Sequence, residues 1–137
     1  MNGNHIFVDT NVLIGWQAGI KSDSDCLKYL FSLRGKRLYT SSLSIAQFVS
    51  VFQKTKPTDE IRKAVNALLA KFNIRSFTEK DITASLEVSN IDMEDNIQYV
   101  ISGKAKCFLF VTNNKKDYDK LTNIKVVIPS KIRQINQ

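Results

Sequence analysis

The chain has 137 residues, of which 43% are hydrophobic and 24% charged, and its formal net charge at pH 7 is +7. These values exclude a disordered or low-complexity protein, and the length suits one hydrophobic core, so we expect a single domain over residues 1–137. The positive charge favours polyanionic partners, with nucleic acid first among them.

Short apolar runs alternate with longer amphipathic segments along the chain. In chain order, the runs that indicate buried strands are 6–8, 38–39, 74, 108–111 and 126–128. The segments with helical spacing of apolar residues are 11–18, 23–34, 43–55, 58–72, 79–89 and 93–105. Each helical segment has a Ser, Thr, Asp or Asn near its start that could cap it, such as Thr58.

Strands that alternate with helices of this length predict an α/β fold. The expected architecture is a three-layer α/β/α sandwich with a central, mostly parallel sheet. In such folds, ligands bind beyond the carboxyl ends of the strands. Polar residues that directly follow the apolar runs are therefore the first candidates for a functional site.

The cysteines, aromatic residues and single histidine have mainly structural interpretations. Cys26 and Cys107 lie among apolar residues and are too few for a disulfide framework, which suits core positions in a reducing cytosol. His5 is expected to have a surface or strand-end role. The aromatic residues expected in packing are Trp16, Tyr29, Tyr39, Phe48, Phe52 and Phe72. Neither a signal-peptide pattern nor a membrane-length apolar stretch is present in the sequence, so we expect a cytoplasmic protein without a membrane partner.

Aspartates recur beside the predicted ligand-binding edge. Asp9 follows the first apolar run, and Asp117 lies shortly after the fourth. Asp92 and Asp95 open a late helix, with the spacing that places both on one face. For Asp9, Asp92 and Asp95, helix capping without any metal is the alternative.

If these carboxylates converge, they repel one another unless a cation or protons neutralise them. A set of oxygen ligands alone favours Mg²⁺ or Mn²⁺ over zinc. Such a metal ion can activate a water molecule for attack on a phosphodiester. The pattern therefore predicts a metal site that acts on nucleic acid.

Four segments, 7–14, 41–47, 92–99 and 110–118, together resemble the PIN-domain family, which includes the virulence-associated toxin C ribonucleases of bacterial toxin–antitoxin pairs. The resemblance implies a metal-dependent endoribonuclease that acts on RNA, is restrained by a small antitoxin protein and forms a homodimer. It also implies the site residues. The metal ligands would be Asp9, Asp95 and Asp117, with Asn113 as a polar helper and Thr112 in contact with phosphate or water.

One position departs from the family pattern. Gln47 stands in the helix after the second strand, where the family usually has a glutamate. A glutamine carbonyl can still accept a hydrogen bond or coordinate a metal, but it brings no negative charge. The alternative function is therefore a PIN-like module of weakened activity that binds RNA or a protein partner. A phosphohydrolase of the haloacid dehalogenase type is a third hypothesis, which Asn11 disfavours because that family has a second aspartate there.

Overall fold

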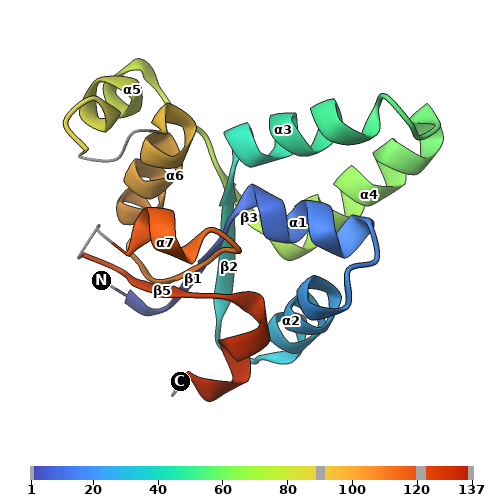
Figure 1. Ribbon diagram of the computed structural model, residues 1–137, viewed down its shortest axis with the longest axis horizontal. Helices are drawn as coiled ribbons and strands as arrows, with labels where there is room; N and C mark the ends of the chain where they lie inside the picture. The colour runs from blue at the N-terminus through green and yellow to red at the C-terminus, as the bar shows by residue number, and fades with distance from the viewer. Residues whose placement is uncertain (1, 89–91, 120–122, 136–137) are drawn as a thin grey trace.

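The computed structural model describes residues 2–88, 92–119 and 123–135 (Figure 1). Its strands are β1 (Asn2–Val8), β2 (Arg37–Ser41), β3 (Asn73–Arg75), β4 (Cys107–Val111) and β5 (Lys125–Val127). Its helices are α1 (Thr10–Gln17), α2 (Lys21–Ser32), α3 (Ser42–Phe52), α4 (Thr58–Lys71), α5 (Glu79–Ser85), α6 (Met93–Lys104), α7 (Lys115–Tyr118) and the 3-10 helix η1 (Pro129–Gln134).

The five strands form one sheet in the order β3-β2-β1-β4-β5, and every described pair is parallel. The central strand β1 pairs with β2 through Ile6 and Leu38, and with β4 through Val8 and Val111. The chain adds β2 and β3 on one side of β1 and then crosses to add β4 and β5 on the other. The carboxyl end of β1 is therefore the point at which the strand order reverses, where ligands bind in open α/β sheets.

Successive residues of β1 face two different hydrophobic cores, as the alternation of side chains along a strand requires. Ile6 and Val8 pack in the core that α1 to α4 and η1 cover. Phe7 stacks on Phe110 in the second core, which α6 and α7 cover. Figure 1 shows α5, α6 and α7 on one side of the sheet and α1 to α4 on the other. The predicted three-layer sandwich is thus confirmed.

The predicted strands and the six predicted helices are present, with ends that differ by a few residues. Two short helices, α7 and η1, were not predicted. Capping was predicted incorrectly twice, because Ile20 and Pro57 precede α2 and α4 without a side-chain hydrogen bond. The prediction for 79–89 extends beyond the end of α5 at Ser85 and reaches residue 89, which lies outside the described residues.

The structural interpretations of the cysteines and aromatic residues are confirmed. Cys26 and Cys107 are free and buried, and burial raises the pKa of each thiol to about 12. The six aromatic side chains expected in packing are buried in the two cores or packed against them. His5 lies in β1, where its Nδ1 is 2.7 Å from the carbonyl oxygen of Ala105. Within the described part of the chain, no helix is long and apolar enough to cross a membrane.

Helices α1 and α2 meet at Gly15, where a side chain has no room. A Cβ atom on Gly15 would lie 1.6 Å from Oδ2 of Asp23, which is itself buried.

We predict that Gly15→Ala destabilises the protein by about 1–3 kcal/mol, the usual cost of overpacking, as measured by urea unfolding. Gly103→Ala is the matched control, because a Cβ atom there meets nothing within 4 Å, and it is expected to stabilise α6 by about 0.5–1 kcal/mol. Equal stabilisation by both substitutions would contradict the close packing at Gly15.

Candidate functional site

Asp9 lies at the carboxyl end of β1, at the reversal of strand order. Its backbone N–H donates to the carbonyl oxygen of Val111 at 2.9 Å, which ties the residue to the end of β4. The side chain of Asp9 caps α1 by accepting from the backbone N–H of Thr10 at 2.8 Å. The capping role and the position at the ligand-binding edge, which the sequence left as alternatives, therefore occur together.

Hydroxyl and amide groups surround the Asp9 carboxylate, which is only 4% exposed. Its Oδ2 accepts from the hydroxyl of Thr112 at 2.8 Å and from the side-chain amide of Asn11 at 3.2 Å. Burial raises the pKa of Asp9, and these hydrogen bonds act in the opposite direction because they stabilise the ionised form. A nearby cation would offset the remaining cost of burying this charge.

Asp95 reaches the same edge from the second layer of helices. The buried hydroxyl of Tyr118 in α7 donates to Oδ1 of Asp95 at 2.9 Å. Burial, together with the charges of Asp92, Asp9 and Asp117, raises the pKa of Asp95 to about 6, although the Tyr118 hydrogen bond acts in the opposite direction. Burial and the charges of Asp9 and Asp95 raise the pKa of Tyr118, so that hydroxyl stays protonated and acts as a donor to Asp95.

Gln47, on α3, faces Asp95's helix across the edge. Its Oε1 accepts from the hydroxyl of Thr10 at 2.6 Å. Its Nε2 donates to Oε2 of Glu94, in the first turn of α6. Gln47 therefore links the helix that follows Asp9 to the helix that carries Asp95.

A buried polar network below Gln47 was not predicted from the sequence. Gln98 is 2% exposed, and its Nε2 donates to Thr10 at 3.0 Å and to Ser44 at 2.8 Å. Its Oε1 accepts from the hydroxyl of Ser41 at 2.6 Å. The only signal for this network was the presence of polar residues at inward positions of α3 and α6. Tyr118 was likewise missed, because α7 itself was not predicted.

Other predicted site residues lie around this edge without entering it. Thr112 is fully buried beneath Asp9, so its contact is with that carboxylate. Asn113 donates from its side chain to Asp23 at 2.9 Å and from its backbone to Asn11 at 3.0 Å. Asp117 is exposed, and Asp92 caps α6 by accepting from the backbone N–H of Asp95 at 3.0 Å. The structure thus brings Asp9, Asp95 and Gln47 together and leaves Asp117 at the margin.

Asp9, Asp95 and Gln47 line an open cleft of about 440 Å³. The lining residues are Asp9, Thr10, Asn11, Ile14, Gln47, Ser50, Val51, Glu94, Asp95 and Asn114. Among the described residues, no group of three or more His, Cys, Asp or Glu side chains is arranged to hold a metal ion. Mg²⁺ nevertheless keeps several waters and is commonly held by one or two carboxylates. The donor set of Asp9 and Asp95 fits a hard divalent cation of this kind.

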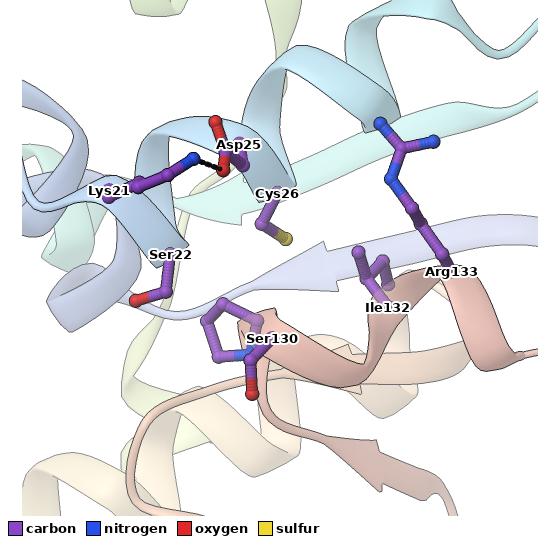
Figure 2. Close-up of a pocket in the computed structure, with 8 residues that line it drawn as sticks. Lys21, Ser22, Asp25, Cys26, Ser130, Ile132 and Arg133 are labelled. Carbon is purple, nitrogen blue, oxygen red and sulfur yellow. Dashed lines mark hydrogen bonds and ion pairs between the residues drawn. The ribbon is translucent and has the colours of Figure 1, made fainter.

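A second pocket, of about 420 Å³, lies between α2 and η1 and shares no residue with the cleft (Figure 2). Lys21 is occupied there by an ion pair with Asp25 at 2.6 Å, as the dashed line in Figure 2 shows. The sulfur of Cys26 faces this pocket, but its raised pKa keeps the thiol protonated at neutral pH. This pocket therefore lacks both a set of metal ligands and an activated nucleophile.

The sequence contains two clusters of basic residues, which differ in how much of their charge is neutralised. One consists of Lys54, Lys56, Arg62 and Lys63, and the other of Lys104, Lys106, Lys115, Lys116 and Lys120. In the cluster at 104–120, Lys104 pairs with Asp81 and Lys115 with Asp119, both at 2.7 Å, while Lys116 is exposed. Lys120 lies outside the described residues. In the cluster at 54–63, the four basic side chains are exposed, and Arg62 has a long contact of 3.8 Å to Asp59.

The sequence also matches a known protein family, in agreement with the order of the strands and the position of the acidic residues. The pattern described as PIN domain matches residues 6–123. The chain belongs to the PIN-domain family. Divalent-metal dependence is general among PIN-domain ribonucleases, which agrees with the oxygen ligands of the cleft.

Individual PIN-domain relatives agree with this assignment. The sequence is 26% identical to Ribonuclease VapC1 of Aquifex aeolicus over 129 residues, which cover 86% of this chain and 87% of the relative. The fold is similar to that of VapBC-1 from nontypeable Haemophilus influenzae, with a TM-score of 0.75, 15% identity and coverage of 93% and 99% of the two chains. It is also similar to VapBC2 from Rickettsia felis bound to a promoter DNA fragment, with a TM-score of 0.73, 17% identity and coverage of 90% and 98%.

The raised pKa of Asp95 gives a prediction about stability in the absence of divalent metal. Between pH 4 and pH 6 the folded PIN domain binds more protons at Asp95 than the unfolded chain does, so its free energy of unfolding falls as the pH rises through this range. Asp95→Asn removes this ionisation and should stabilise the metal-free protein at pH 7.5 by on the order of 1 kcal/mol, less than the full shift implies because Asp95 is partly exposed. Urea unfolding in EDTA at pH 4 and pH 7.5 measures the effect. Destabilisation by Asp95→Asn at pH 7.5 would contradict this prediction, because it would show that the ionised Asp95 carboxylate does not lower the free energy of unfolding.

Proposed function

We propose that this PIN-domain protein is a metal-dependent endoribonuclease that hydrolyses RNA phosphodiester bonds in the cleft lined by Asp9 and Asp95. The observation that carries the proposal is the meeting of these two carboxylates, which come from the end of β1 and from α6 and line the same cleft. A similar sequence is named as a ribonuclease, which supports RNA as the substrate.

Asp9 and Asp95 would hold Mg²⁺ or Mn²⁺, and Asp117 would approach from the exposed side. When bound, such an ion lowers the pKa of water and offsets the charge that develops on the phosphate. The reaction joins a water oxygen to phosphorus and breaks one bridging P–O bond. The charge of Asp117 helps to raise the pKa of Asp95, which supports an electrostatic contribution from Asp117.

The protein's own side chains prepare the cleft for this reaction. Thr112 and Asn11 fix the orientation of the Asp9 carboxylate, and Tyr118 fixes that of Asp95. Because these donors are already in place, little reorganisation is needed when a ligand binds. The net charge of +7 attracts the RNA backbone toward a cleft whose own side chains are acidic.

The proposal extends to a biological role as the toxin of a toxin–antitoxin pair in the cytoplasm. It is supported by the similarity of the fold to chains from VapBC assemblies and to a structure described as a toxin–antitoxin complex from Klebsiella pneumoniae. A small antitoxin protein and a second copy of the chain are the expected protein partners. A short neighbouring reading frame that encodes an antitoxin-like protein would support this role.

We predict that Asp9→Asn and Asp95→Asn each lower the rate of metal-dependent RNA cleavage at least about 100-fold, since even residues outside the ligand shell contribute roughly 10–100-fold. The assay follows cleavage of a mixture of structured and unstructured RNAs with Mg²⁺ or Mn²⁺, and with EDTA as the blank. Asp59→Asn is the matched control, because its side chain is 90% exposed on α4 and lies outside the cleft. It should retain full activity.

Two results would decide against the enzyme. If the unmodified protein leaves every RNA intact with either metal, or if cleavage survives Asp9→Asn unchanged, the cleft is not a nuclease site. Retained RNA binding without cleavage, measured by a gel-shift assay, would instead identify the PIN-like binding module that the glutamine at position 47 allows.

A further inference from the structure

We propose that Glu94 supplies the carboxylate that this chain lacks at position 47, and that Gln47 acts as the positioning residue that holds Glu94 in the cleft. The inference rests on the proposed metal-dependent function. It is carried by the contact between the Gln47 amide and the Glu94 carboxylate, and by the presence of both side chains in the lining of the cleft.

The hydrogen bonds of Gln47 determine which way its amide faces. The Thr10 hydroxyl donates to Oε1 of Gln47, so the carbonyl end of the amide is directed toward α1. Its NH₂ group is then the end available to α6, where it donates to Glu94. Gln47 therefore presents a donor to the cleft, which cannot coordinate a cation. Glu94 lines the cleft and contacts Gln47, so its carboxylate can supply the oxygen ligand that the Gln47 amide does not.

A run of donors with one direction leads to this contact. The Ser41 hydroxyl donates to Gln98, and the Gln98 amide donates to Thr10. Thr10 donates to Gln47, and Gln47 donates to Glu94. An ionised Glu94 can only accept, so the end of the Gln47 amide that faces it must be the NH₂ group. The Glu94 carboxylate thus fixes the orientation of Gln47, and the buried hydroxyl and amide groups of Ser41, Gln98 and Thr10 pair with one another in the same direction.

The charges explain why glutamine and Glu94 occur together. A glutamate at position 47 would place a second carboxylate directly against Glu94, and the two would repel each other. The neutral amide replaces this repulsion with a hydrogen bond to a charged acceptor, which is stronger than a neutral one. With Gln47 and Glu94, the cleft therefore has as many carboxylates as it would have with a glutamate at position 47 and a neutral residue at position 94. The first turn of α6 also favours a negative charge at Glu94.

The experiment measures Mn²⁺ affinity in the absence of RNA, by electron paramagnetic resonance of free Mn²⁺, so that its readout does not depend on catalysis. Glu94→Gln should weaken Mn²⁺ binding by about tenfold or more. The exchange variant Gln47→Glu with Glu94→Gln returns one carboxylate and one amide to the same contact. It should restore the affinity to that of the unmodified protein.

Positioning by Gln47 is tested in the same assay. Gln47→Ala should weaken Mn²⁺ binding when Glu94 is present and have no further effect when Glu94 has been replaced by glutamine, since the residue acts through that carboxylate. Asp92→Asn is the matched control. It removes one negative charge from the same end of α6, and asparagine still caps the helix. If only the negative charge near the cleft mattered, Asp92→Asn and Glu94→Gln would weaken Mn²⁺ binding equally. Circular dichroism and thermal unfolding establish that each variant is folded.

The outcomes separate this inference from the proposed function. If Asp9→Asn abolishes Mn²⁺ binding while Glu94→Gln leaves it unchanged, or weakens it no more than Asp92→Asn does, the inference about Glu94 is wrong and the metal site stands. Failure of the exchange variant to restore affinity also overturns the inference. If Asp9→Asn leaves Mn²⁺ binding unchanged, the metal site itself, and with it the proposed function, is overturned.

Discussion

The site depends on one buried charge, the carboxylate of Asp9, and on the strand pairing that supplies its partners. Because Val8 of β1 is in register with Val111 of β4, the residues that follow, Asp9 and Thr112, lie side by side where both strands end. A carboxylate in this position is costly unless hydrogen bonds or a cation compensate it. The hydroxyls and amides around it provide part of that compensation, and the proposed metal ion would provide the rest.

Much of the fold and part of the site could be predicted because the relevant signals are local in the sequence. Buried parallel strands give continuous apolar runs, and the carboxyl ends of such strands meet at one edge. This reasoning placed Asp9, Asp95 and Asp117 at one edge, and the cleft includes the first two. The resemblance to the PIN-domain family identified position 47 as the departure from the family pattern. It could not establish which side chains turn toward each other, because the orientation of an amide or a carboxylate depends on partners distant in the chain.

The features that were missed have physical reasons. Helix α7 has four residues and η1 is a 3-10 helix, and elements this short have too little periodicity to be recognised. Tyr118 could not be assigned a role without α7. The contact between Glu94 and Gln47 could not be predicted, because it joins positions 47 residues apart. The starts of α2 and α4 lack the predicted side-chain caps, because the residues that precede them, Ile20 and Pro57, have apolar side chains that cannot accept a hydrogen bond.

The cleft draws on all three layers of the sandwich: Asp9 comes from the central sheet, Gln47 from α3 on one face, and Asp95 with Tyr118 from α6 and α7 on the other. Thr112, which donates to the Asp9 carboxylate, lies 103 residues further along the chain, and Tyr118 follows it. A chain still attached to the ribosome therefore cannot complete this cleft until the segment that carries Thr112 and Tyr118 has emerged.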